Sequence, residues 1–391
     1  MRVLYISPYP PARDGIGDYT QFLATAIRDR GCDVRVVVPR ADPGAPPEVL
    51  GATGWLPWPP ASARQRIAEF RPDVVHVQFA VAAFGARTMT LACWLRVLRR
   101  DLGVPVVVTM HEVTRDTALL RATGRAIYRR IAAACDLAIV HTQAASSALT
   151  GPVGVPASTV TVIPHPTAEP PAGDVEPGEL RDRFGLDDAR VLLAFGFVHV
   201  DKGLQDLVGA VSALHRSDAA LMDGARVVIA GAVRRRHGVF RAFEARDHLH
   251  LRRVLRLARR NGVREHLILT GYVPDREVAA WFQMAEAVVL PYRRIEQSGV
   301  AGLAVALNVP VLASQVGGLD EQFGGGPWIF PARDPAALSS VLARFLSTPT
   351  DAHGPAVTRR EPLDVAAVAA TTLEAYAKAV GDSAEGLAHV G

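Results

Sequence analysis

Lys202 is one of two lysines in a chain of 391 residues that uses arginine for almost all of its positive charge. It follows an apolar run that ends near Gly196 and precedes Gly203, a pattern typical of a strand, a tight turn and a helix start. A lysine ammonium is a compact charge suited to phosphate. Lys202 therefore indicates an anion-binding turn, with chance placement as the alternative.

A second polar loop follows the apolar run over 287–291, and an apparent helix begins after it. The candidate binding residues of this loop are Arg293, Arg294, Glu296, Gln297, Ser298 and Gly299. Backbone N–H groups at a helix start bind anions well. We expect the last two residues of the loop to offer such groups to a phosphate or a sugar hydroxyl.

A glycine pair, Gly15 and Gly17 with Ile16 between them, separates the first apolar run from a helical stretch. Such glycines allow a ligand to approach the backbone at a helix N-terminus. The spacing differs from the dinucleotide fingerprint because Thr20 replaces the third glycine, and the second apolar run ends at Arg40 without an acidic residue. A nicotinamide dehydrogenase is therefore disfavoured, and a loop that only makes a turn stays open.

Three histidines stand at the ends of neighbouring apolar runs: His76, His111 and His141. The carboxyl ends of parallel strands are where α/β proteins bind ligands. A single histidine at such a place is more often structural. Three of them make a site and a structural role equal alternatives, with His111 as the main candidate for a site.

These residues can form a site only if a sheet brings the ends of its strands together. Short apolar runs rich in β-branched residues alternate with helical segments over the whole chain, which predicts parallel strands covered on both faces. The runs cover 3–7, 34–39, 74–78, 105–111, 137–142, 160–164, 191–197, 226–231, 267–271, 287–291 and 309–314. Two successive series of this kind predict an α/β protein with two doubly wound, Rossmann-like domains.

A stretch rich in proline and glycine, 164–173, separates the two series because proline removes hydrogen-bond donors and fixes φ. We predict a first domain over 1–170 and a second over 171–360. The remaining residues, 361–391, contain a terminal helix over 363–380 and a frayed tail from 382.

Composition restricts the class of protein. Hydrophobic residues make up 49% of the chain, charged residues 21%, and the net charge is +4, so a nucleic-acid binder is disfavoured. Three widely spaced cysteines, no leader-like start and no apolar run of membrane length predict a cytoplasmic protein. The excess of arginine and alanine suggests a GC-rich, actinobacterial genome. A basic amphipathic stretch over 246–260 is interpreted as a surface helix, with weak contact to an anionic membrane as the alternative.

Taken in order, these motifs resemble those of the retaining glycosyltransferases of family 4. The matching segments are 15–17, 163–165, Gly196 with Lys202-Gly203, 271–273, 291–310 and 316–321. The resemblance implies a GT-B architecture, in which two Rossmann-like domains face each other across a cleft. It implies an acceptor held by the first domain, a nucleotide sugar held by the second, and neither a cofactor nor an obligatory metal.

The resemblance also assigns roles to residues. Lys202, His111 and Glu296 are the implied catalytic residues, and the leaving phosphate takes the acceptor's proton. The implied donor-binding residues are Gly196, His199, Val273, Arg293, Arg294, Gln297, Ser298 and Gly299. Gly15, Ile16 and Gly17 form the implied loop beside the phosphates and the acceptor.

Two positions depart from the family pattern. The second of two paired glutamates falls on Leu303 or Ala304, so the carboxylate that binds the ribose is absent. The arginine that accompanies the lysine is expected where the chain has Phe197 and His199. We therefore expect transfer of a hexose-like sugar, with retention, from a nucleotide-diphosphate sugar to a hydroxyl of a polysaccharide, glycolipid or secondary metabolite. A non-catalytic partner of another transferase and a nucleotide-sugar epimerase are the alternatives; the sequence leaves the oligomeric state open.

Overall fold

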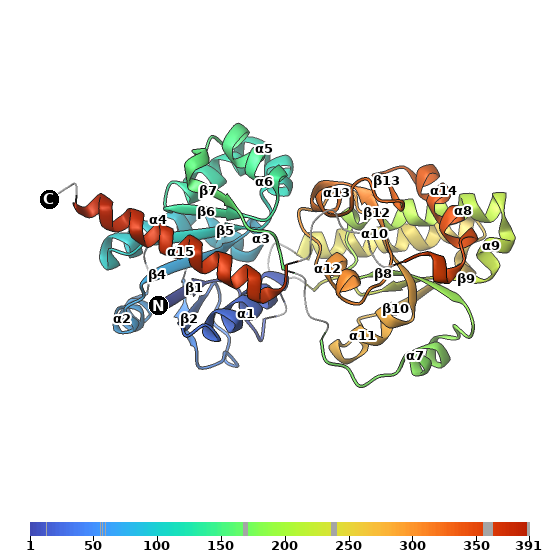
Figure 1. Cartoon of the computed structure of the whole chain (residues 1–391), viewed down its shortest axis with the longest axis horizontal. Helices are drawn as coiled ribbons and strands as arrows, with labels where there is room; N and C mark the ends of the chain where they lie inside the picture. The colour runs from blue at the N-terminus through green and yellow to red at the C-terminus, as the bar shows by residue number, and fades with distance from the viewer. Residues whose placement is uncertain are drawn as a thin grey trace. The chain divides into compact units, whose positions relative to one another are not determined.

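The chain folds into two compact units. The computed structural model describes residues 1–12, 14–54, 56, 58, 60–166, 171–235, 241–354 and 363–388. Unit 1 comprises Met1–Pro166 and Leu363–Gly391, and unit 2 comprises Thr167–Pro362 (Figure 1). Part of the predicted linker, 167–170, and the last residues of the predicted tail, 389–391, lie outside the described residues.

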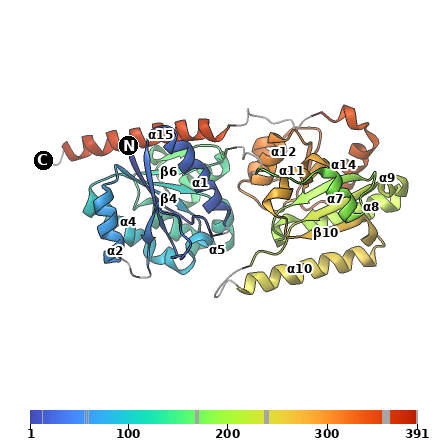
Figure 2. The ribbon, with the colours of Figure 1, turned by 90° about the horizontal axis from the view of Figure 1, so that it is seen from below.

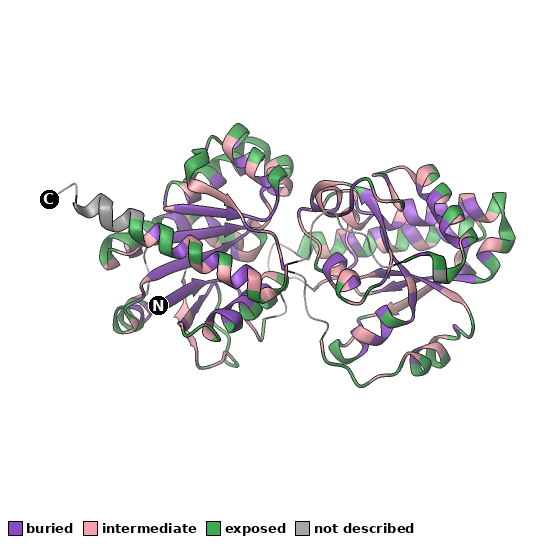
Figure 3. Cartoon of the chain, viewed as in Figure 1, coloured by how far each residue is buried: buried purple, intermediate pink, exposed green. Residues whose placement is uncertain are grey.

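Unit 1 contains a seven-stranded sheet in the order β3-β2-β1-β4-β5-β6-β7, and all of its strand pairs are parallel. The strands are β1 (Arg2–Ile6), β2 (Asp33–Val38), β3 (Val49–Ala52), β4 (Val74–Phe79), β5 (Val106–Met110), β6 (Leu137–Val140) and β7 (Val160–Val162). Every residue of β4 and β5 is buried, as the continuous apolar runs predict (Figure 3).

Helices cover both faces of this sheet. They are α1 (Gly15–Arg28), α2 (Ala61–Phe70), α3 (Val81–Phe84), α4 (Thr88–Leu102), α5 (Val113–Ala132), α6 (Gln143–Ala148) and α15 (Val365–Ala388). The last of them, at the C-terminal end of the chain, packs on α1 and closes one face of unit 1 (Figure 1). It brings the buried Tyr376 within 3.0 Å of Tyr5, hydroxyl to hydroxyl, and extends beyond the predicted end at 380.

Unit 2 repeats the design with a six-stranded parallel sheet in the order β10-β9-β8-β11-β12-β13. Its strands are β8 (Arg190–Phe195), β9 (Ala225–Ala230), β10 (Leu267–Gly271), β11 (Ala285–Leu290), β12 (Val311–Gln315) and β13 (Ile329–Pro331). Its helices are α7 (Pro177–Phe184), α8 (Leu204–Ser217), α9 (Ala219–Asp223), α10 (Arg241–Arg260), α11 (Asp275–Gln283), α12 (Gly299–Ala306), α13 (Gly317–Phe323) and α14 (Pro335–Ser347). Helices α8, α10 and α14 cover one face, and α7, α11, α12 and α13 cover the other. Figure 2 shows α10 along the outside of the unit.

Two strands are absent from the sequence-based prediction: β3 and β13. Both are short edge strands, so each lacks the buried apolar run that reveals a central strand.

The expectation of no membrane-length apolar stretch also has an exception within the described residues. Val81–Leu102 has the length of a span and a mean hydropathy of 1.2, and 39% of its apolar window is buried. It comprises α3, a 3-10 turn and α4, and the buried Trp94 and Leu95 belong to the core of unit 1.

Candidate active site

The glycine loop of unit 1 is shaped by close backbone contact. A Cβ on Gly17 would lie 3.3 Å from the backbone of Pro8 and Tyr9, so the helix start packs directly against the end of β1. Asp14 caps α1 by accepting a hydrogen bond from the Ile16 amide at 2.9 Å. That amide is one of the donors expected to bind a phosphate. The structure therefore gives it an internal partner, which an anion would have to displace.

The three predicted histidines do come together, because β4, β5 and β6 are neighbours in the sheet. The rings of His111 and His141 are 4.9 Å apart, and His165 follows at 5.3 Å from His141. Tyr19 of α1 packs against all three of these rings at 4.9–5.4 Å. His111 keeps part of its surface accessible, whereas His76 and His141 are buried.

His76 connects this group to the terminal helix. Its Nδ1 lies 2.5 Å from the Tyr376 hydroxyl, and its Nε2 lies 2.7 Å from the Thr109 hydroxyl. Gln78, on the same strand, lies between the rings of His76 and His111, with its amide nitrogen 3.4 Å from His76 Nε2. Sequence reasoning did not predict this connection because Tyr376 is 300 positions from His76 along the chain.

Hydrogen bonds determine where the protons of the central pair lie. His141 Nδ1 is 2.8 Å from the Ile163 carbonyl and must donate to it, so in the neutral ring Nε2 is an acceptor. His111 Nδ1 lies 3.3 Å from that nitrogen. His111 Nε2 lies 2.7 Å from the Gln78 amide oxygen and donates to it. Nε2 is thus bonded internally, and a sugar hydroxyl would reach it by replacing Gln78.

The histidines of this cluster are neutral near pH 7. Burial lowers the pKa of His76 to about 3 and that of His141 to about 3. Burial, together with His141 and His165, holds the pKa of His111 well below its usual range. Burial likewise lowers the pKa of His165. This edge of unit 1 therefore offers aromatic surface and neutral hydrogen-bonding groups.

In unit 2 the turn that carries Lys202 is held against the loop after β11. The Arg293 amide donates to the Asp201 carbonyl at 2.8 Å, and the Lys202 ammonium lies 3.7 Å from the centre of the Tyr292 ring. Gly203 has φ 66°, and a Cβ there would lie 1.7 Å from the Pro291 carbonyl oxygen. Only glycine allows this approach, which explains the Lys-Gly pair of the sequence.

Gly196, at the end of β8, lies against the start of α12. A Cβ on Gly196 would lie 3.5 Å from Val300, and Ser298 caps α12 by accepting from the Ala301 amide at 3.2 Å. Glu296 is 3% exposed, Gln297 is partly exposed and Gly299 is exposed. Of the two residues on which the second glutamate of the family could fall, Leu303 is partly buried and Ala304 is fully buried in the core.

Val273 lies apart from these residues, on the loop after β10 at the edge of the sheet. Its side chain is 8% exposed and packs in the core, so only its backbone can contact a ligand. The neighbouring Tyr272 is 48% exposed. Gly231 bridges the ends of the strands: it pairs with Gly271, and its Cβ position lies 2.0 Å from the Gly196 carbonyl oxygen.

The two predicted donor-binding arginines differ. Arg293 forms a bidentate ion pair with Asp206, both N–O distances being 2.6 Å, and this hydrogen bonding raises the pKa of Arg293. Its charge is therefore already paired within the unit, and a diphosphate would share it with Asp206. Arg294 is exposed on the same loop.

His199 is coupled to an arginine that the motif comparison did not find. Its Nε2 lies 2.9 Å from an Arg246 guanidinium nitrogen, and its Nδ1 lies 3.2 Å from the Asp201 amide nitrogen. Arg246 belongs to α10, 47 residues further along the chain, and supplies a positive charge near the place where the family arginine is missing.

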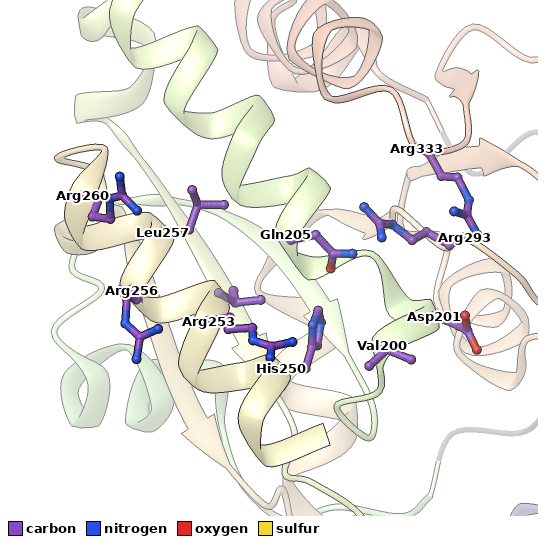
Figure 4. Close-up of a pocket in the computed structure, with 11 residues that line it drawn as sticks. Val200, Asp201, Gln205, His250, Arg253, Arg256, Leu257, Arg260, Arg293 and Arg333 are labelled. Atoms are coloured by element: carbon purple, nitrogen blue, oxygen red, sulfur yellow. The ribbon is translucent and has the colours of Figure 1, made fainter. Parts of the chain in front are cut away.

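A pocket of about 590 Å³ adjoins the Lys202 turn (Figure 4). Arginines from α10 line one side, arginines from the loops after β11 and β13 line the other, and Gln205 of α8 lies between them. The arginines are Arg253, Arg256, Arg260, Arg293 and Arg333. The basic helix of the sequence thus places part of its charge on a hollow of unit 2.

Two Rossmann-like units in one chain correspond to the GT-B fold. Solved structures of similar fold include Anabaena HepE in complex with UDP and glucose, with a TM-score of 0.66 at 14% identity over 100% of both chains. Another is sucrose-phosphate synthase from Thermosynechococcus elongatus, with a TM-score of 0.68 at 17% identity over 100% of this chain and 99% of that one.

Sequence comparison identifies the family. Residues 13–167 match Glycosyltransferase Family 4, and residues 189–348 match Glycosyl transferases group 1. The chain belongs to this family of glycosyltransferases. It is 29% identical to D-inositol 3-phosphate glycosyltransferase of Xylanimonas cellulosilytica, over 78% of this chain and 72% of the relative. It is 24% identical to the GDP-mannose-dependent alpha-(1-6)-phosphatidylinositol monomannoside mannosyltransferase of Mycolicibacterium smegmatis, over 92% of each.

Proposed function

We propose that this glycosyltransferase moves a hexose-like sugar, with retention, from a nucleoside-diphosphate sugar to a hydroxyl acceptor. Unit 2 holds the donor and unit 1 the acceptor. The observation that carries the proposal is the Lys202 turn: Gly203 brings it onto the Pro291 carbonyl, and the lysine ammonium lies over the Tyr292 ring. Such a fixed cation stabilises the negative charge that grows on a leaving diphosphate.

In the proposed reaction the bond between the anomeric carbon and the diphosphate breaks while the acceptor oxygen bonds to the same face of that carbon. The acceptor's proton passes to the leaving phosphate oxygen. Arg246 assists Lys202 from beside His199. The neutral His111 contributes a hydrogen bond to the sugar rather than a charge. No carboxylate nucleophile and no metal ion take part.

Phosphorylated polyols and glycolipids are the first acceptors to try, because the named substrates of the two relatives above are D-inositol 3-phosphate and a phosphatidylinositol mannoside. We propose that the reaction takes place in the cytoplasm. For a lipid acceptor, the exposed arginines of α10, such as Arg252 and Arg259, would contact the anionic membrane surface.

The test combines UDP- and GDP-sugars with these acceptors, with and without a chelator, and follows nucleoside diphosphate release and the anomeric configuration of the product. Acceptor-dependent release with retained configuration supports the proposal. An epimerised donor without release indicates an epimerase. Absence of donor binding indicates a non-catalytic partner, a reading that the apolar Ala304 favours.

A further inference from the structure

Three metal-ligating side chains of unit 2 meet away from the residues described above. His215 lies in the last turn of α8, Asp223 ends α9, and His266 ends a 3-10 turn that leads into β10. Asp223 comes just before β9, and His266 comes just before β10. The group therefore lies at the amino ends of the strands, whereas the Lys202 turn follows the carboxyl end of β8. Figure 1 shows α8 and α9 beside β9.

The geometry of these side chains is that of a tridentate group. One potential ligand atom from each residue lies within 4.8 Å of the other two. The rings of His215 and His266 are 5.0 Å apart at an angle of 52°. Ligand atoms on a tetrahedral zinc ion are roughly 3.3 Å apart, given metal–ligand distances of about 2.0–2.2 Å. Asp223 is exposed, so its side chain has room to close the remaining gap.

Three nitrogens of the two imidazoles are buried without the partners that such groups normally have. Neither ring nitrogen of His266, which is 3% exposed, has a hydrogen-bond partner among the described residues, and His215 Nδ1 has none there either. A neutral imidazole presents one donor and one acceptor, and leaving them unpaired inside a protein is costly. A metal ion that accepts a ring lone pair removes part of this cost.

A neighbouring arginine is bonded to the backbone. The Arg226 guanidinium donates to the carbonyls of Asp223 and Ala225 at 3.0 and 2.8 Å. These bonds to main-chain oxygens leave the Asp223 carboxylate for a metal ion.

We propose that His215, Asp223 and His266 bind a zinc ion, with water as the fourth ligand. Two imidazoles and one carboxylate are ligands that zinc accepts in proteins. The ion would join the end of α8, the end of α9 and the start of β10, and would stabilise this edge of unit 2. The site is separate from sugar transfer, so it does not require the proposed function to be correct.

The test is a zinc titration of the full chain after removal of metals with a chelator. We expect one zinc ion per chain and a rise in melting temperature on binding. His215→Ala and Asp223→Asn, both at positions that are not buried, should each weaken zinc binding at least tenfold. His248→Ala, an exposed histidine of α10, is the matched control and should bind zinc normally.

Three results would overturn the proposal: no stoichiometric zinc binding, unchanged affinity in both ligand variants, or loss of binding in His111→Gln instead. The last result would place the zinc in the histidine cluster of unit 1. Folding of each variant is checked by its melting curve in the absence of zinc, so that a lost site is distinguished from a lost fold.

Discussion

The two units present opposite kinds of chemistry at the carboxyl ends of their strands. In unit 1, His76, His111 and His141 are neutral, and each of them has hydrogen-bonding partners within the fold. In unit 2, Lys202 and Arg246 bring positive charge to the same turn: Lys202 is on this partly exposed turn, and Arg246 contacts His199 at its start. The same architecture thus provides an uncharged surface suited to hydroxyl groups and a charged one suited to phosphates. This difference is the basis for the proposal that unit 1 holds the acceptor and unit 2 the donor.

Loss of the Lys202 charge should have the largest effect. Lys202→Ala removes a fixed cation from the leaving group, and removal of one such stabiliser lowers the rate by about 10²–10³. Steady-state kinetics should show the loss mainly in kcat. Lys378→Ala removes the other lysine of the chain, on the exposed side of α15, and should leave turnover unchanged. Equal activity of both variants would mean that the charge of unit 2 is not used in this way.

Displacing the same turn should have the next largest effect. Gly203→Ala places a Cβ 1.7 Å from the Pro291 oxygen at φ 66°, so the turn must move and Lys202 with it. We expect kcat to fall at least about tenfold and the melting temperature to drop. Gly262→Ala has a similar φ of 71° with open space around the Cβ position, and should cost only about 1 kcal/mol of stability. Identical behaviour of the two variants would contradict the close contact.

Acid should destabilise the neutral cluster of unit 1. The unfolded chain binds protons on these histidines below about pH 6.5, whereas burial lowers the folded pKa of His76 to about 3. Their contribution is therefore fully present above pH 6.5 and is lost as pH falls, by up to about 1.4 kcal/mol per pH unit for each histidine. We expect the free energy of unfolding, measured with urea, to fall less steeply between about pH 7 and pH 5 in His76→Gln than in the unaltered chain. An equally steep fall in both proteins would mean that His76 is charged in the folded state.

The smallest expected effect concerns the ribose. Because Leu303 or Ala304 stands where the family pattern has a carboxylate, we expect the ribose hydroxyls to lack a charged partner worth about 1.5–3 kcal/mol. Ribo- and 2′-deoxyribonucleotide donors should therefore give kcat/KM values within about threefold of each other. Strong rejection of the deoxy donor would reveal another residue that binds the ribose.

The sequence predicted the sheets and the strand ends better than the partners of individual side chains. Continuous apolar runs identify central strands because both faces of a parallel sheet are buried, and they brought His76, His111 and His141 to one edge correctly. The pairing of Arg293 with Asp206 was not predicted, because it joins residues 87 positions apart. Arg246 was missed for the same reason: local spacing reveals turns, while a contact between two helices depends on the whole fold.

Titration of the nucleoside diphosphate into three proteins tests the division between the units most directly. The diphosphate should bind His111→Ala with an affinity within about threefold of the unaltered chain, because its charge is met by unit 2. Lys202→Ala should bind it at least about tenfold more weakly, a loss of roughly 1.4 kcal/mol. The opposite pattern, with binding lost in His111→Ala and kept in Lys202→Ala, would contradict the assignment of the charged donor to unit 2.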